Sequence, residues 1–328
     1  MDIQLSRIEQ LLVRKNGRYT FHDLSLVYAR DRAAEEKSED AARASRMRLY
    51  AFLLDGLTTA RSAERQSPEG VEREAGAAHL WLDDHAQEAS AAARAALDAG
   101  WARSAEFLRG LGEWLHFAGR CAPSEEIYRF LLSALPRTTA PYADAMRELG
   151  EVQRVQGRYD DAVSAHEEAR TVHRKLGDKL GEAKTTSGLG DIHYAQSRYA
   201  EATEAYGFAL TVYQDLGNSP GEANTISGLG DVHYGQKRYA EAAEAFENAL
   251  TVYQDLGGRR GQANALDSLA HIDVIFDRRR MALSRLRRTR QLFIELGLAN
   301  LITICDRALD EVKQVSYGLC DVVIIRLS

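Results

Sequence analysis

The sequence repeats itself with a period of 40 residues, and this repeat constrains the fold more than any other feature. Residues 185–199 read TTSGLGDIHYAQSRY, and residues 225–239 read TISGLGDVHYGQKRY. Over the whole period, 181–220 and 221–260 agree at about 28 of 40 positions, and fainter copies flank them at 141–180 and 261–300. A unit of this length cannot bury a core alone, so such units stack on one another into an elongated array.

Each copy predicts two helices. The first helix carries a Leu followed by a small residue, and the second carries two small residues seven positions apart, which share one face because seven residues make about two turns. We therefore expect the small residue of the first helix to meet an Ala of the second at close approach. The first-helix markers are Leu149-Gly150, Leu189-Gly190, Leu229-Gly230 and Leu269-Ala270, and the second-helix pairs are Ala162 and Ala169, Ala202 and Ala209, Ala242 and Ala249, and Ala282 and Thr289.

A Gly follows the last Leu of every second helix, at Gly177, Gly217, Gly257 and Gly297. Glycine accepts the left-handed conformation that closes a helix, so these positions predict helix ends. The Gly-Leu-Gly segments could instead suggest a phosphate-binding loop. Such a loop follows a strand, and no residues upstream alternate as a strand does, so we interpret these glycines as packing and capping residues.

The pattern of Leu and Gly, an aromatic at the turn (Tyr159, Tyr199, Tyr239), and then Ala, an aromatic and Ala resembles the tetratricopeptide repeat. Tyr206 and Phe246 fill the second aromatic place, while His166 and Leu286 depart from it. The period exceeds the usual value of about 34 residues, which implies a second helix longer by one to two turns. The resemblance implies an all-α, right-handed superhelical solenoid of antiparallel helix pairs, preceded by an N-terminal helical segment.

The predicted organisation has four parts. An N-terminal winged-helix remnant with helices is expected at 1–66, and degenerate repeat-like helices at 75–140. The clear array is expected at 141–314, with units at 141–180, 181–220, 221–260 and 261–300 and a capping helix at 298–314. A β-prone apolar tail follows at 315–328.

The N-terminal part resembles a second family. Residues 17–36 read GRYTFHDLSLVYARDRAAEE, a short extended piece and then a helix. The phrase is similar to the winged-helix module of actinobacterial STAND-type regulators of the antibiotic-regulatory class, and the matching residues are Phe21, His22, Asp23, Leu24, Tyr28, Ala29 and Arg30. That family places an ATPase upstream, but no G-x-x-x-x-G-K-[ST] occurs in this chain, so it is either a stand-alone descendant or part of a longer protein.

Composition narrows the class of protein further. The formal net charge of −6 over 328 residues announces no global attraction to nucleic acid or membrane. No apolar run approaches the roughly 20 residues of a membrane span, and the start of the chain lacks the pattern of a signal peptide. The three cysteines, Cys121, Cys305 and Cys320, are far apart and show no metal-ligand spacing. We expect a cytoplasmic protein without a metal or cofactor, and the sequence leaves its oligomeric state open.

Two Asp-x-His pairs, Asp191 with His193 and Asp231 with His233, invite a metal or acid-base interpretation. They recur at one place in the repeat, and no third ligand or nucleophile accompanies them, so we favour a packing role. No nucleophile, base and orienting group converge in the sequence, and we therefore do not expect an enzyme.

Residues 277–291, DRRRMALSRLRRTRQ, form an arginine run on a predicted helix whose buried side is Ala282, Leu286 and Phe293. One interpretation is a contact surface for an anionic partner, either nucleic acid or an acidic protein face, and the other is a solvated outer surface. The candidate residues are Arg278, Arg279, Arg280, Arg285, Arg287, Arg288 and Arg290.

The resemblance to tetratricopeptide arrays also implies an inner groove, lined by fixed positions of the first helices. These positions are polar where a core would be apolar, which favours binding of a protein or peptide segment over a merely solvated surface. We therefore expect a non-catalytic sensor or scaffold in a bacterial regulatory system, with a DNA-associated transcriptional regulator as the alternative. The groove residues are Asp144, Arg147, Glu151, Arg154, Lys184, Ser187, Asp191, Tyr194, Asn224, Ser227, Asp231, Tyr234, Asn264, Asp267 and His271.

Overall fold

The computed structural model describes residues 12–15, 18–21, 47, 50, 51, 54, 86–296 and 299–314. The chain divides into two compact units, Met1–Ala63 with Ser67–Leu131, and Glu64–Gln66 with Leu132–Ser328. The helix predicted after Leu24, the terminal Gly297 of the last repeat and the tail at 315–328 lie outside the described residues. Within the described part, no helix has the length and apolar character that a membrane span requires.

The described part of the first unit contains a β-hairpin, the helices α5 and α6, and most of α7. Strand β1, Leu12–Lys15, pairs antiparallel with β2, Arg18–Phe21, so that Val13 lies opposite Thr20. The sequence predicted the extended piece at β2 but not its partner strand. The helices are α5 (Ala86–Asp98), α6 (Ser104–Phe117) and α7 (Cys121–Ala134).

Helices α6 and α7 pack closely at one small residue. The ring of Tyr128 on α7 is fully buried against Gly112 of α6, where an added Cβ would lie 2.7 Å from the ring. Ser124 donates a hydrogen bond of 2.7 Å to the carbonyl oxygen of Gly112. Because a side chain at Gly112 would collide with the ring, this small residue sets how closely the two helices approach.

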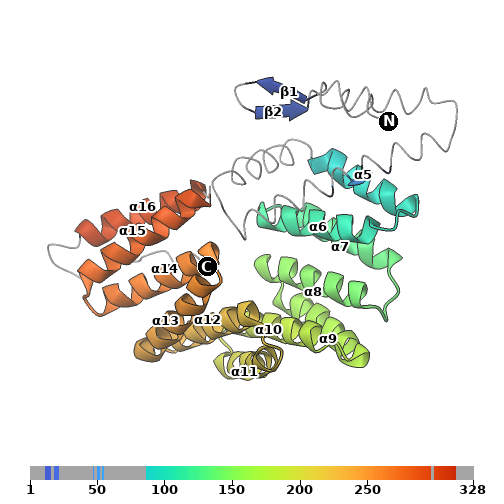
Figure 1. The fold of residues 1–328 in the computed structure, drawn as a ribbon. Helices are drawn as coiled ribbons and strands as arrows, with labels where there is room; N and C mark the ends of the chain where they lie inside the picture. Colours follow the sequence, from blue (N-terminus) through green and yellow to red (C-terminus); the bar gives the residue numbers. More distant parts are fainter. Residues whose placement is uncertain are drawn as a thin grey trace. The chain divides into compact units, whose positions relative to one another are not determined.

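The second unit is a stack of helix pairs followed by a single helix (Figure 1). Each helix packs on the next along the chain, and the first helices of neighbouring pairs also touch, as α8 touches α10 and α10 touches α12. We call α8, α10, α12 and α14 the first layer and α9, α11, α13 and α15 the second layer. The bounds are α8 Ala140–Val155, α9 Tyr159–Leu176, α10 Lys179–Ala195, α11 Tyr199–Asp215, α12 Ser219–Gly235, α13 Tyr239–Asp255, α14 Arg259–Ile275, α15 Arg279–Glu295 and α16 Ala299–Gln314.

The first-layer glycines are packing residues, as the sequence predicts, but in the two central pairs their partners differ from the prediction. A Cβ added at Gly190 would lie 2.7 Å from the ring of Tyr206, and one at Gly230 would lie 2.8 Å from the ring of Phe246. The same Tyr206 ring is also 2.7 Å from the Cβ position of Gly228 in the next pair. Gly190, Gly228 and Gly230 therefore accommodate an aromatic ring that enters between two first-layer helices. The predicted contact with an Ala occurs in the outer pairs, where an added Cβ at Gly150 would lie 3.2 Å from the carbonyl oxygen of Ala162 and Ala270 packs with Ala282.

The turns use left-handed backbone at regular places. Gly177, Gly217 and Gly257 end their helices with φ of 71°, 62° and 67°, which confirms the predicted helix ends. The turns inside the pairs adopt the same conformation without glycine at Ser197, Lys237 and Asp277. A non-glycine residue in this region is uncommon, and the sequence pattern gave no sign of it.

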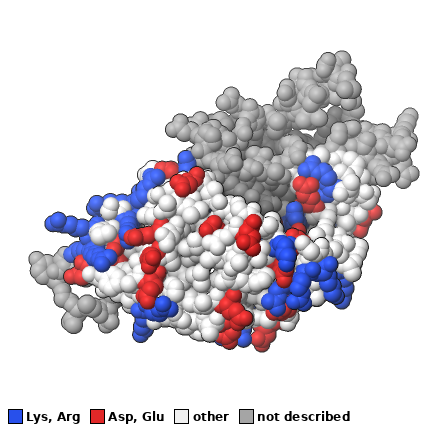
Figure 2. Space-filling model, turned by 60° about the horizontal axis from the view of Figure 1, so that its bottom comes forward, with Lys and Arg blue, Asp and Glu red and all other residues white. Residues whose placement is uncertain are grey.

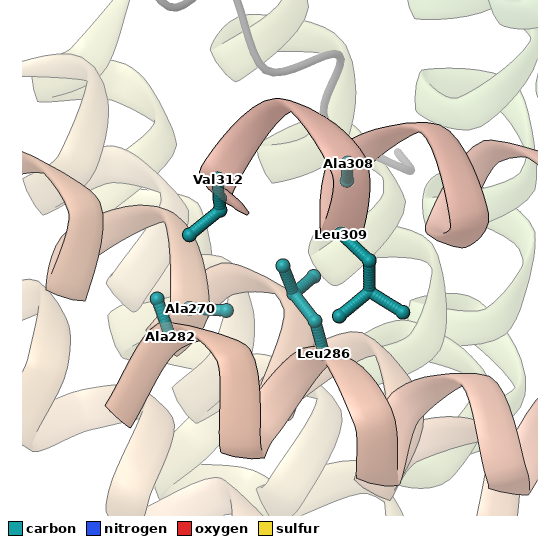
Figure 3. Packing of buried hydrophobic residues seen from close by; sticks show 6 residues of the cluster. All are labelled: Ala270, Ala282, Leu286, Ala308, Leu309 and Val312. Atoms are coloured by element: carbon teal, nitrogen blue, oxygen red, sulfur yellow. The ribbon is translucent and has the colours of Figure 1, made fainter. Parts of the chain in front are cut away.

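Helix α16 covers the last pair of the array. Ala270 of α14 and Ala282 and Leu286 of α15 pack against one side of α16 (Figure 3). The residues of α16 in this cluster are Ala308, Leu309 and Val312. A second cluster joins Phe293 to the buried Cys305. Helix α16 thus occupies the place of a further first-layer helix, which a terminal repeat needs in order to bury its apolar side.

Candidate binding face of the first layer

The fifteen residues predicted to line a groove all lie on α8, α10, α12 and α14, at equivalent positions. Lys184, Asn224 and Asn264 are exposed, whereas Asp267 and His271 are buried, with 3% and 4% of their surface accessible. This face is therefore polar but only partly open. The remaining ten are half-buried: Asp144, Arg147, Glu151, Arg154, Ser187, Asp191, Tyr194, Ser227, Asp231 and Tyr234.

Charges on α8 are largely satisfied within the first pair. Arg154 donates to Glu151 over 2.9 Å, and Nε2 of the fully buried His166 lies 3.2 Å from the same carboxylate. Burial acts to raise the pKa of Glu151, but His166 and Arg154 outweigh it and lower the pKa to about 2. Arg147 pairs with its neighbour Glu148. The α8 end of the face is thus a network of paired charges.

Second-layer side chains extend their polar tips to the first layer through the glycine gaps. The Tyr206 hydroxyl donates a 2.6 Å hydrogen bond to Asp191, and the Tyr253 hydroxyl donates one of 2.8 Å to Asn224. Sequence reasoning missed these contacts. The sequence did contain one signal of these contacts. The aromatic position of the repeat holds a side chain with a polar tip fifteen residues after an acid, His166 after Glu151 and Tyr206 after Asp191.

Asp191 has a carboxylate whose pKa is shifted in the opposite direction to that of Glu151. Burial raises the pKa of Asp191 to about 6, and the nearby charges of Glu151 and Asp231 act in the same direction. The Tyr206 hydrogen bond and Arg154 oppose the shift but do not cancel it. Asp191 therefore lies in an acidic row, one carboxylate per helix pair, in which its own charge is incompletely compensated.

Tyr194 and Tyr234, which the sequence placed in the groove, pack against the tyrosines that begin the following helices. The ring centroids of Tyr194 and Tyr199 are 6.2 Å apart, and those of Tyr234 and Tyr239 are 5.5 Å apart. The second pair continues to Phe276, 6.3 Å from Tyr239. These rings form aromatic contacts along the turns and leave only part of each ring open to a ligand.

The Asp-x-His pairs do not converge on one point. Asp191 faces Tyr206, whereas His193 lines a cavity on the second-layer side together with Glu201 and Glu204. Burial lowers the pKa of both His193 and His233. Among the described residues, no group of three or more potential ligands is close enough to hold a metal ion.

The arginine run forms several contacts within the protein itself. Arg285 lies 2.9 Å from the buried Asp273 and 3.1 Å from Glu247, and Arg290 lies 2.5 Å from Asp306 of α16. Further contacts join Arg278 to the Phe276 ring, Arg279 to the carbonyl oxygen of Lys313, and Arg288 to Glu295. The sequence could not show the partners of Arg285 and Arg290, because Asp273, Glu247 and Asp306 lie on other helices. Figure 2 shows Lys and Arg gathered on the side of the view where Figure 1 places α15 and α16, with acidic side chains among them.

The fold and this face define an α-solenoid of helix pairs, a class that presents extended helix layers to its partners. The helix pairs are tetratricopeptide repeats: the family model described as tetratricopeptide repeat matches residues 142–215 and 221–295. A search of curated protein sequences finds no match.

Several solved structures resemble the chain at low sequence identity. A STAND protein from Pyrococcus horikoshii with a tetratricopeptide repeat sensor is 12% identical, with a TM-score of 0.56 over 97% of this chain and 50% of that protein. BtubC (BKLC) from P. vanneervenii is 17% identical, with a TM-score of 0.48 over 74% of this chain and 94% of that one. A Rap protein complexed with competence and sporulation factor is 13% identical, with a TM-score of 0.49 over 95% and 97%. At these identities the likeness concerns the fold alone.

Proposed function

We propose that the first layer binds a segment of a partner protein, and that the chain acts as a non-catalytic, cytoplasmic sensor or scaffold in a bacterial regulatory system. The observation that carries this proposal is the polar first-layer face. There the exposed Lys184, Asn224 and Asn264 recur at one position per pair, above half-buried acids and tyrosines. Side chains repeated at the spacing of the helices suit an extended or helical segment that lies across several pairs.

A regulatory role is supported by two resemblances. Residues 17–36 are similar to the winged-helix module of actinobacterial STAND regulators, and the fold matches a STAND protein whose tetratricopeptide repeats are its sensor. In that arrangement the array detects a signal, and another part of the regulator responds to it. Binding is favoured over catalysis because the Asp191 and His193 side chains point to different surroundings.

The DNA-associated alternative has less support from the arginine run. Arg285 and Arg290 are engaged with Asp273 and Asp306. DNA binding depends on cations that can neutralise phosphates, so arginines already paired within the protein contribute less to it. We therefore propose a protein segment as the partner.

The test selects peptides from a displayed random library on the full chain and then measures their affinity for two matched variants. Asn224→Arg with Asn264→Arg places bulky cations on the first layer, and we expect at least a tenfold loss of affinity, about 1.4 kcal/mol. Asn248→Arg with Gln254→Arg makes the same kind of change at exposed second-layer positions and should leave affinity unchanged. Equal effects of the two variants, or no selected peptide, would contradict the proposal.

A further inference from the structure

A cavity of about 380 Å³ lies on the second-layer side of the array, and residues of α9, α10 and α11 line it. Leu189 and Ala205 give it an apolar base, and Phe208 stands beside them. Arg174 of α9, His193 of α10 and Glu204 of α11 supply polar groups. None of these residues belongs to the first-layer face.

Two neighbouring residues of α11 are unusual for a helix face that stays in water, one because it lowers helix propensity and one because it exposes an aromatic ring. Gly207 is exposed in mid-helix, with nothing within 4 Å of an added Cβ, and glycine there costs about 1 kcal/mol relative to alanine. Phe208 leaves 43% of its surface exposed. The next repeat, identical at about 28 of 40 positions, has Glu247 and Asn248 at these places. Both departures favour an interface, since glycine lets another helix approach and Phe208 offers an aromatic anchor.

The two arginines that line the cavity lie toward one end of it and two of its four glutamates lie toward the other, while Glu182, from the first turn of α10, lies at the arginine end. Consecutive helices run antiparallel, so α9 and α11 run parallel to each other. The C-terminal end of α9 and the N-terminal end of α11 therefore lie at opposite edges of the second layer. Arg170 and Arg174 come from the last turns of α9, whereas Glu201 and Glu204 come from the first turns of α11. Arg170 is paired with Glu167 at 2.6 Å. Within the described chain, Arg174, Glu201 and Glu204 form no salt bridge.

We infer that this surface binds a second copy of the same chain, in a two-fold symmetric contact centred on α11. Two antiparallel α11 helices would cross at Gly207, and the Phe208 ring of each copy would enter the cavity of the other. The same rotation brings the arginine end of one copy opposite the Glu201 and Glu204 end of the other. A two-fold contact requires a self-complementary surface, and this one places Arg174 and Glu204 on opposite sides of its apolar centre.

The adjacent repeat explains why the contact forms at one place. The positions equivalent to Arg170, Arg174 and Phe208 hold Leu210, Gln214 and Asn248, so that repeat lacks both the cations and the anchor. A single self-complementary surface gives a closed dimer, whereas a surface repeated along the array would permit open assembly.

The first test measures the molar mass of the full chain by sedimentation equilibrium at concentrations up to about 100 µM. We expect a concentration-dependent dimer. Gly207→Glu with Phe208→Asn installs the residues of the next repeat and should give a monomer. At concentrations low enough for the wild type also to be monomeric, the variant should melt no lower than the wild type. A monomeric wild type, or a variant that still dimerises, would overturn the inference.

The second test reverses charges across the contact. Arg174→Glu alone and Glu204→Arg alone should each weaken dimerisation by at least about tenfold, because each places like charges opposite one another. The two changes in one chain should restore dimerisation. Gln254→Glu and Glu244→Arg, at exposed positions of α13, serve as controls and should have no effect. Failure of the double variant to recover would count against the two-fold arrangement.

Discussion

Single aromatic rings that pass between glycines hold the helix layers together. The Tyr206 ring lies between Gly190 and Gly228, and a Cβ added at either glycine would lie 2.7 Å from the ring. Phe246 takes the same place beside Gly230. The sequence identified these glycines as packing residues because they recur in the repeat. It could not identify the rings as their partners, because that contact depends on how far each side chain reaches across the helix pair.

Two glycine substitutions in neighbouring helices should have opposite effects on stability. Gly190→Ala forces the new methyl group into the Tyr206 ring and should lower the free energy of unfolding by about 1–3 kcal/mol. Gly207→Ala adds a methyl group in open space and should raise it by about 0.5–1 kcal/mol through helix propensity. Urea denaturation measures both, in a Phe208→Asn background so that association does not contribute. If Gly190→Ala also raised the free energy of unfolding, the contact with Tyr206 would not limit the packing of the two helices.

The Asp191 carboxyl should make stability depend on pH. Its folded pKa of about 6 exceeds the unfolded value of about 3.9, so protonation favours the folded state. The stability from this group is complete below pH 4 and is lost as the pH rises to 6 and beyond. Asp191→Asn keeps an acceptor for Tyr206 and removes the charge. It should therefore raise the free energy of unfolding by about 1–2 kcal/mol at pH 7.5 and change it little at pH 4. A gain of equal size at both pH values would contradict this origin.

Among the elements, α15 departs most from its sequence-based interpretation. The arginine run suggested a surface for an anionic partner, but Arg285 lies between Asp273 of α14 and Glu247 of α13. Asp273 is 1% exposed, and burial raises its pKa while Arg285 opposes this. The spacing of charges along one helix cannot reveal acids on its neighbours, so the role of each arginine depended on the packing of three helices.

Two arginines of α15 should therefore differ sharply in their effect on stability. Arg285→Ala leaves the buried Asp273 without its nearest cation and should cost about 3 kcal/mol, since breaking a buried pair strands a charge. Arg287→Ala changes an exposed position and should alter stability by less than about 0.5 kcal/mol. Thermal and urea unfolding of both variants, with Arg285→Lys as a partial rescue, provide the measurement. Similar costs for the two would indicate that Asp273 does not depend on Arg285.

At the scale of the whole molecule, the all-α class, the repeat frame and the helix pairs could be predicted from the sequence, because each repeat carries the same local sequence signals. The Leu-Gly marker, the turn aromatic and the terminal Gly agree across the copies, apart from Ala270 and Arg279 in the last one, and agreement between levels specifies a fold. The candidate face was harder to anticipate, because its character depends on contacts between pairs. Asp267 and His271 share the pattern of their equivalents and yet are buried. Strand β1 was missed because a hairpin in the first unit has no counterpart in the repeat.

The stability of a stacked array is approximately the sum of the stabilities of its repeats and of the interfaces between neighbours. A destabilising substitution at one end should therefore affect mainly the helices near that end. Leu309 of α16 is 6% exposed and packs with Ala270, Ala282 and Leu286. Leu309→Ala should cost about 2–5 kcal/mol locally and speed amide hydrogen exchange in α14, α15 and α16, while α8 to α11 keep their protection. Arg307→Ala, at an exposed position of the same helix, is the matched control and should leave exchange unchanged. Hydrogen exchange followed by mass spectrometry resolves these segments. A uniform loss of protection from α8 to α16 would mean that the array unfolds as one cooperative block, in which case α16 stabilises the whole stack and not only its last pair.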